Sequence, residues 1–267
     1  MNWWKVLLTW PYLLLIYLKM GSMTKKVLKD PTLVPESKRY VWLKKKTKYI
    51  RWLYNVKIIS HDIENWPKHK GCVLVANHQS NFDFIILLSL NDFYQFAPLG
   101  FIAKTELKEN RIARRFIFLI DVLFIDRKDP RNALEVFKEA KDLIRNPGRT
   151  MVIFPEGTRS HGQAMQEFKP GALKLAYQAY VPILPVSIVN SYQIFDKKIK
   201  GRKTIHVVFH KVFEPQQFIQ LTSVNLTKQI QNKIAQGIKQ WDSNVNQTDD
   251  SIIATEGSED ANDIKKN

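Results

Sequence analysis

The stretch VLVANHQSNFDFIILL, residues 73–88, sets the class of fold because it joins two apolar runs of different kinds. The first run is short and rich in valine, which favours a buried strand, and the second reads as a helix. Between them lies NHQSNFD, residues 77–83, a polar segment that would connect the strand to the helix. The stretch therefore predicts a strand-and-helix unit of an α/β protein.

The same alternation of strand and helix signals continues along the chain. It predicts an α/β domain with a mostly parallel central sheet flanked by helices, whose ligands would bind beyond the carboxyl ends of the strands. The expected strands lie at residues 55–60, 71–77, 101–104, 122–127, 150–157, 183–190 and 204–213, and the expected helices at 82–90, 110–120, 130–146, 171–179 and 222–241.

Length and composition divide the chain into three parts. With 267 residues, 45% of them hydrophobic, it can form one full-sized core. We expect an N-terminal anchoring region at residues 1–57, the α/β domain at 58–242 and a disordered acidic tail at 243–267. The tail is polar, lacks aromatic residues, and has six acidic residues against two lysines.

Charge and cysteine content narrow the range of partners and compartments. The formal charge of +16 indicates an anionic partner. Charge alone does not decide whether this partner is nucleic acid, an anionic membrane or a phosphorylated substrate. The single cysteine, Cys72, cannot form an intramolecular disulfide, which suits a reducing, cytosol-facing compartment. We expect Cys72 to fill the core of its strand.

The N-terminus has the composition of a membrane anchor. Residues 3–18 are almost all apolar, with Lys5 and Pro11 among them. As a helix, this run would reach about 24 Å, short of the roughly 30 Å hydrocarbon core of a bilayer, so it could anchor without spanning. Residues 39–55 mix lysine and arginine with tryptophan and tyrosine, which is typical of an interfacial helix over anionic lipid. A solvated basic helix is the alternative.

His78 and Asp83 in the polar segment have two interpretations. Ser80 and Asp83 ahead of an apolar run form a capping-box pattern, in which Asp83 would only satisfy backbone donors. A five-residue step through a turn would also return Asp83 to His78, so that the carboxylate orients the imidazole as a general base. Because the chain has no G-x-S-x-G motif, such a base would activate a hydroxyl of the substrate.

A second candidate segment is FPEGTRS, residues 154–160, which follows an expected buried strand. Gly157 would let backbone amides approach a ligand, and the planar guanidinium of Arg159 suits a phosphate. Lys104 and Arg127 also stand at expected strand ends, which gives three candidate cations for one dianion. A tight turn with solvated cations is the alternative interpretation.

His206 and His210 have the i, i+4 spacing of a zinc site, but the residues between them favour a strand. In a strand the two rings would start roughly 13 Å apart, too far to share a metal that lies about 2.0 Å from each nitrogen. We therefore predict no metal site.

Four short blocks between residues 72 and 189 follow one another in the order found in a known enzyme family. The first two read N-H-x-S-x-x-D and K-x-E-L with a later D-R, and are matched by Asn77, His78, Ser80, Asp83, Lys104, Glu106, Leu107, Asp126 and Arg127. The last two are the complete F-P-E-G-T-R-S and an apolar stretch around Pro185. In these blocks the chain resembles the glycerolipid acyltransferase family, in particular the bacterial 1-acyl-sn-glycerol-3-phosphate acyltransferases.

The resemblance implies an enzyme that moves a fatty acyl group from a thioester donor to the free sn-2 hydroxyl of lysophosphatidic acid, making phosphatidic acid. It implies His78 as general base and Asp83 as its orienting partner, with no acyl-enzyme. The implied substrate-binding residues are Lys104, Arg127, Glu156, Gly157, Thr158 and Arg159. The donor would be acyl-CoA or acyl carrier protein, with no other cofactor. The family's two-helix N-terminal motif would hold the enzyme on the cell membrane, in contact with anionic lipid and facing the cytoplasm.

The chain departs from the family in the second block. Arg111, Arg114 and Asp121 stand at about the positions of a family proline and two glycines, in a segment expected to shape the acyl pocket. Acyl length and donor type are therefore the least transferable properties. The alternatives are an acyltransferase for glycerol 3-phosphate or a lysophospholipid, a non-enzymatic membrane- or nucleic-acid-binding module, and a hydrolase. The chain lacks RRM, KH and zinc-finger signatures, so we expect no nucleic-acid partner.

Overall fold

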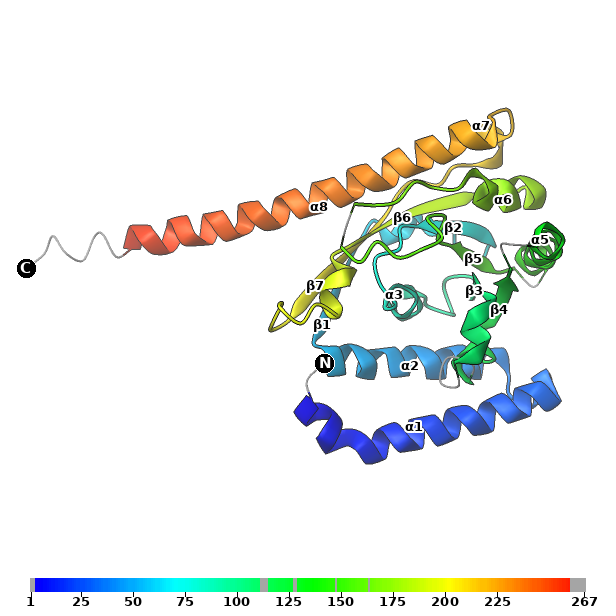
Figure 1. The fold of residues 1–267 in the computed structure, drawn as a ribbon, viewed down its shortest axis with the longest axis horizontal. Coiled ribbons are helices and arrows are strands. Elements are labelled where there is room, and N and C mark those ends of the chain that lie inside the picture. The colour runs from blue at the N-terminus through cyan, green and yellow to red at the C-terminus, as the bar shows by residue number, and fades with distance from the viewer. Residues whose placement is uncertain (1–2, 111–114, 127–128, 147, 163, 260–267) are drawn as a thin grey trace, which may run out of the picture.

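The computed structural model describes residues 3–110, 115–126, 129–146, 148–162 and 164–259. The described strands form a seven-stranded sheet in the order β1-β7-β6-β2-β5-β3-β4 (Figure 1). β6 and β7 pair antiparallel, and the other neighbours pair parallel, which confirms the predicted α/β sheet. The strands are β1 Val56–His61, β2 Cys72–Ala76, β3 Leu99–Lys104, β4 Asp121–Ile125, β5 Thr150–Ile153, β6 Ile183–Val189 and β7 Lys203–Phe209.

Helices cover both faces of this sheet (Figure 1). α2 and α3 pack on one face, with α1 outside them, while α5, α6 and α8 pack on the other. The helices are α1 Trp3–Lys29, α2 Glu36–Tyr54, α3 Asp83–Leu90, α5 Pro130–Arg145, α6 Lys174–Ala179, α7 Pro215–Phe218 and α8 Ser223–Glu259.

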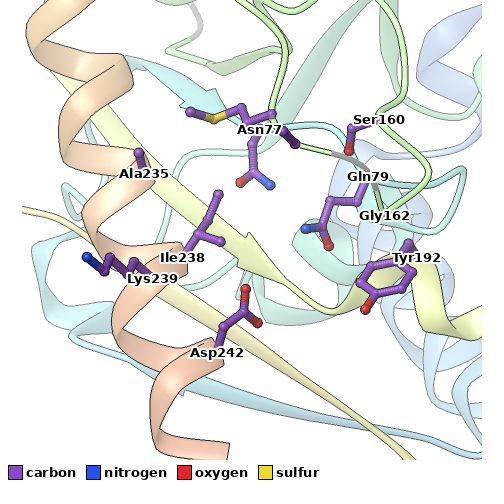
Figure 2. Close-up of a pocket in the computed structure, with 11 residues that line it drawn as sticks. Asn77, Gln79, Ser160, Gly162, Tyr192, Ala235, Ile238, Lys239 and Asp242 are labelled. Atoms are coloured by element: carbon purple, nitrogen blue, oxygen red, sulfur yellow. The ribbon is translucent and has the colours of Figure 1, made fainter.

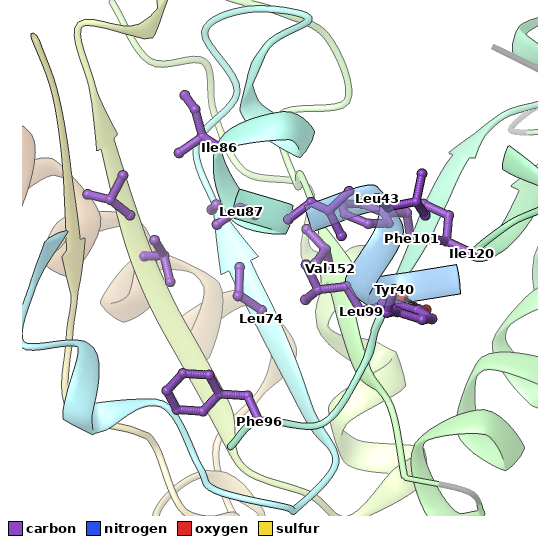
Figure 3. Close-up of a cluster of buried hydrophobic side chains, with 14 of the residues drawn as sticks. Tyr40, Leu43, Leu74, Ile86, Leu87, Phe96, Leu99, Phe101, Ile120 and Val152 are labelled. Atoms are coloured by element: carbon purple, nitrogen blue, oxygen red, sulfur yellow. Dashed lines mark hydrogen bonds between the residues drawn. The ribbon is translucent and has the colours of Figure 1, made fainter. Parts of the chain in front are cut away.

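β2 is buried along its whole length because it lies between these two layers of helices. Leu74 belongs to the cluster on the α2 and α3 side, with Leu87, Leu99 and Val152 (Figure 3). Its neighbours Val73 and Val75 belong to the cluster formed with α5, α6 and α8. Burial on both faces explains why the strand reads as a continuous apolar run, as strands of parallel sheets do. Cys72 is fully buried in β2, as predicted.

The central position of β2 and β5 fixes where the two polar segments meet. β2 and β5 are parallel neighbours, with Val75 opposite Ile153. Residues 77–83 follow β2 and residues 154–160 follow β5, so both segments leave the sheet at the same edge. This is the edge where ligands of parallel sheets bind.

α1 and α2 pair antiparallel through polar and aromatic side chains. Nζ of Lys5 donates to the carbonyl of Trp52 at 2.8 Å, and Nζ of Lys46 donates to the hydroxyl of Tyr12 at 2.8 Å. α1 lies on the side of α2 away from the sheet (Figure 1) and exposes most of its apolar side chains. The exposed ones are Trp4, Leu7, Leu8, Trp10, Tyr12, Leu14, Leu15, Leu18 and Leu28.

Among the described residues, α1 is the helix whose length and composition would allow it to cross a membrane. It is longer than the apolar run predicted at 3–18, because the lysine-rich residues after Leu18 also form helix. Core helices of soluble proteins and signal sequences meet the same criteria, so α1 is weak evidence of membrane association.

Three other expectations concern where segments begin and end. The expected boundary before residue 58 falls inside β1, so the N-terminal region and the sheet domain share a strand. The helix expected at 110–120 includes residues 111–114, which lie outside the described residues together with Arg111 and Arg114. α8 continues to Glu259, and its backbone is therefore helical over part of the segment expected to be a disordered tail. Composition indicated that this segment has little to bury, and α8 extends away from the sheet there (Figure 1).

Candidate active site

His78 and Asp83 meet at the end of β2, as the sequence predicted. Nδ1 of His78 lies 2.7 Å from Oδ2 of Asp83, which opens α3. The Asp83 side chain has no exposed surface, whereas 22% of the His78 side chain is exposed. Because a carboxylate only accepts hydrogen bonds, Nδ1 carries the proton, and the lone pair of Nε2 is left for a substrate.

The carboxylate of Asp83 also holds the turn that leads from β2 to α3. Oδ2 accepts from the backbone N–H groups of Gln79 at 2.8 Å and Ser80 at 3.0 Å. Asp83 therefore both satisfies backbone donors and contacts the His78 ring, so the contacts that each interpretation requires are present. The predicted capping box is half formed: Asp83 accepts from the Ser80 N–H, but Ser80 Oγ accepts from the Phe82 N–H, and the N-cap of α3 is Phe82.

The two polar segments are joined by hydrogen bonds. The backbone N–H of His78 donates to Oε1 of Glu156 at 2.6 Å, and the N–H of Ser160 donates to the carbonyl of His78 at 2.9 Å. The His78 ring also stacks on Phe154, with ring centroids 4.2 Å apart. Gly157 has φ 72°, a left-handed conformation that favours glycine and completes the turn after Phe154.

Glu156 is a buried carboxyl that fixes two backbone segments. Its second oxygen, Oε2, accepts from the N–H of Gln166 at 2.7 Å. Burial raises the pKa of Glu156, while the hydrogen bonds from the His78 and Gln166 backbones act in the opposite direction. Glu156 therefore supports the position of His78 rather than facing solvent.

Two of the three expected cations, Lys104 and Arg159, lie at the same edge of the sheet. Arg159 is half-buried in the turn after β5, and Lys104 is the exposed last residue of the neighbouring strand β3. Thr158 is exposed beside Arg159. Arg127 lies outside the described residues. Asp121, one of the residues in which the second block departs from the family pattern, begins β4 and receives a hydrogen bond from Arg149.

A pocket of about 490 Å³ lies beside this site, between the loops and α8 (Figure 2). Asn77, Gln79 and Ser160 line one side, and Ala235 and Ile238 of α8 line the other. His78 is not among its lining residues, because the side chains of Asn77 and Gln79 turn towards β6 while His78 turns towards Asp83 and Phe154. The pocket is therefore lined by the neighbours of His78 and not by His78 itself.

Sequence reasoning missed two polar residues, Ser191 and Gln79. The hydroxyl of Ser191 donates to Oδ1 of Asp83, and its N–H donates to the side-chain oxygen of Gln79 at 2.9 Å. Ser191 stands 108 residues from Asp83, and nothing in the pattern around it distinguishes it from other serines. Asn77, which the sequence did mark, pairs with both backbone groups of Ile188 in β6 and so brings the end of β6 to this site.

His206 and His210 have separate partners. Nδ1 of His206 lies 3.1 Å from Nε2 of His61, and Nε2 of His210 lies 2.7 Å from the hydroxyl of Ser187. Burial lowers the pKa of His210 to about 4. Within the described ranges there is no group of three or more His, Cys, Asp or Glu residues arranged to hold a metal ion.

Comparisons with known proteins bear on this arrangement. The family model named Acyltransferase matches residues 57–189, which include His78, Asp83 and the whole FPEGTRS turn. A Mycoplasma genitalium protein named probable 1-acyl-sn-glycerol-3-phosphate acyltransferase is 36% identical over 238 residues, covering 84% of this chain and 87% of that protein. The chain belongs to the acyltransferase family.

Two further comparisons cover different shares of the chain. The human 1-acyl-sn-glycerol-3-phosphate acyltransferase alpha is 35% identical over 156 residues, 58% of this chain and 53% of its own length. The crystal structure of the 1-acyl-sn-glycerophosphate (LPA) acyltransferase PlsC from Thermotoga maritima has a TM-score of 0.66 and 23% identity, and covers 85% of this chain and 97% of that one. The two acyltransferases therefore share a fold.

Proposed function

We propose that this acyltransferase moves a fatty acyl group from a thioester donor to the free sn-2 hydroxyl of lysophosphatidic acid and so makes phosphatidic acid. The observation that carries the proposal is the 2.7 Å contact between His78 Nδ1 and the fully buried Asp83 carboxylate. The names of the relatives support the choice of acceptor.

The chemistry follows from the free nitrogen of His78. Nε2 accepts the proton of the acceptor hydroxyl while that oxygen attacks the thioester carbonyl carbon. The buried Asp83 carboxylate stabilises the imidazolium that forms. The tetrahedral intermediate then collapses, the C–S bond breaks, and the imidazolium returns its proton to the leaving thiolate. The nucleophile belongs to the substrate, so no acyl-enzyme forms.

The acceptor phosphate is held at the same edge of the sheet in this proposal. The guanidinium of Arg159 offers paired donors to phosphate oxygens, and Lys104 and Arg127 add positive charge. Glu156, Gly157 and Thr158 form the turn that presents Arg159. No metal and no cofactor other than the donor, acyl-CoA or acyl carrier protein, enters the mechanism.

The location proposed for the enzyme is the cytoplasmic face of the cell membrane. The exposed apolar side chains of α1 would enter one leaflet, and the basic residues of α2 would contact anionic lipid. Lysophosphatidic acid would then reach the site from the bilayer, and the thioester from the cytosol.

Acyl transfer from a labelled thioester to lysophosphatidic acid in vesicles tests the proposal. We expect product from the wild type and a loss of at least about a hundredfold in His78→Ala. His69→Asn is the matched control, because His69 is exposed and has a left-handed backbone that asparagine tolerates. Full activity of a folded His78→Ala protein would refute general-base catalysis by His78.

The choice of acceptor needs a separate experiment. Glycerol 3-phosphate and lysophospholipids should compete poorly with lysophosphatidic acid for the labelled donor. Equal or faster acylation of either competitor would show that lysophosphatidic acid is not the preferred acceptor. The proposed role of His78 as general base would not be affected.

A further inference from the structure

We propose that Ser191, held by Gln79, is a positioning residue that fixes the carboxylate of Asp83 and thereby the catalytic ring of His78. The proposal rests on the proposed function, because it assigns a role within general-base catalysis. Ser191 lies outside the four sequence blocks and begins a short 3₁₀ turn, Ser191–Ile194, after β6.

The two oxygens of Asp83 have different partners. Oδ2 accepts from Nδ1 of His78 and from the N–H groups of Gln79 and Ser80. Oδ1 accepts only side-chain hydroxyls, from Ser80 at a long 3.2 Å and from Ser191 at a short distance. Ser191 thus makes the closer of the two contacts to Oδ1, and these contacts hold the carboxylate oxygen that does not bond His78.

Gln79 connects Ser191 back to the catalytic segment. The side-chain oxygen of Gln79 accepts the backbone N–H of Ser191 at 2.9 Å, while the backbone N–H of Gln79 donates to Asp83. Gln79, Ser191 and Asp83 therefore form a closed ring of hydrogen bonds. Gln79 also immediately follows His78, so the ring is attached to the residue that it positions.

The backbone before Ser191 favours this arrangement. Asn190 has φ 69° and ψ 12°, a left-handed conformation that asparagine adopts more readily than most residues. The turn places both the N–H and the hydroxyl of Ser191 towards the segment that follows β2. Ser191 has no exposed surface, so its donors are available only to these protein partners.

Removal of the Ser191 hydroxyl would have two effects on catalysis. The carboxylate would be held less firmly, so the His78 ring would spend less time in the productive orientation. One fewer donor would also leave more negative charge on Asp83, which favours the imidazolium over the neutral imidazole. The acid limb of the pH–rate profile should therefore move to higher pH, which a purely structural loss would not cause.

Ser191→Ala, measured with wild type and His78→Ala, tests the proposal. We expect kcat to fall about ten- to a hundredfold, less than the full general-base contribution, with both KM values within about twofold of wild type. The acid limb should move to higher pH, and Ser191→Thr, which keeps the hydroxyl, should restore most of kcat. Ser187→Ala is the matched control, because Ser187 is an equally buried serine of β6 that bonds His210 and the carbonyl of Ile234 instead.

Gln79 provides an independent variant in case Ser191→Ala does not fold. Gln79→Met removes the side-chain amide, with its acceptor oxygen and its N–H donors, and should lower kcat in the same direction by a few-fold, whereas Gln79→Glu keeps an acceptor oxygen. Wild-type kcat and an unmoved acid limb in folded Ser191→Ala, or in folded Gln79→Met, would overturn the positioning role. If His78→Ala is inactive in the same assays, the proposed function stands even though the positioning role of Ser191 is refuted. If His78→Ala is active, both proposals fall.

Discussion

The backbone N–H of His78 donates a hydrogen bond to a carboxylate oxygen of Glu156, so Glu156 holds the main chain of the proposed general base. The side chain of His78 is held separately by Asp83. Two buried carboxyls from different strand ends therefore fix one histidine, one through its backbone and the other through its ring.

Glu156→Gln should change how stability depends on pH. Burial raises the pKa of Glu156, so the folded state holds this proton more tightly than the unfolded state. The stabilisation that Glu156 contributes is complete below the ordinary glutamate pKa of 4.5, and it is lost as the pH rises through the pKa of Glu156 in the folded state. The free energy of unfolding of the wild type relative to Glu156→Gln should thus fall with rising pH in that window. Urea unfolding across the window measures it, and a constant or rising difference would contradict the prediction.

Arg149→Met should destabilise the contact between α2 and the sheet. Arg149 pairs with Glu36 of α2 and, at 2.6 Å, with Asp121 of β4, and only 7% of its side chain is exposed. We expect a loss of about 2–3 kcal/mol in the free energy of unfolding, because two carboxylates lose their partner while about a quarter of each stays exposed. Arg145→Met, at an exposed arginine of α5, should cost less than about 1 kcal/mol in the same denaturant titration. Equal losses in both variants would show that the ion pairs are not the cause.

Cys72 should not react with thiol reagents in the folded protein. Burial raises the pKa of its thiol to about 12, and the side chain has no exposed surface. Because the thiolate is the reactive form, maleimide should label Cys72 only after unfolding in urea. Mass spectrometry of native and unfolded samples measures this. Rapid labelling under native conditions would show that the start of β2, where Cys72 lies, becomes exposed to solvent in the folded protein.

Replacement of Leu7 and Leu8 by glutamine should weaken binding to anionic vesicles by more than about tenfold, since each apolar side chain would bury surface in the lipid. These residues are 78% and 70% exposed on α1, so the fold should be unaffected. Leu134→Gln is the control, because Leu134 is 65% exposed on α5, across the sheet from α1. Co-sedimentation with vesicles compares the variants, and an equal effect of all replacements would argue against α1 as the binding surface.

The sequence was sufficient for the parts of the site that depend on local geometry. His78 and Asp83 lie within one turn, and the segments after β2 and β5 meet because parallel strands end at one edge. Ser191 could not be predicted, because its contact with Asp83 depends on the pairing of β2 with β6 and on the turn at Asn190. The antiparallel pairing of β6 with β7 was equally hidden, since a strand pattern does not encode direction.

The length of α1 shows a further limit of the sequence argument. Apolarity ends at Leu18, and the length expected for the apolar helix was calculated only to that residue. Lysine, methionine and leucine are all good helix formers, so the helix itself continues to Lys29. A segment predicted from its hydrophobicity was therefore shorter than the helix that contains it.

Arg149 attaches α2 to the sheet and α1 lies along α2, so the helix pair is joined by direct contacts to the domain that carries His78. If the helix pair binds a lipid surface, the protein can move only by sliding in the plane of the membrane and by rotating about the membrane normal. With the membrane location and lipid acceptor proposed above, the entrance to the site would stay at a constant depth, and the search for the acceptor would be two-dimensional. A flexible tether would have supplied proximity alone, whereas this pairing also supplies orientation.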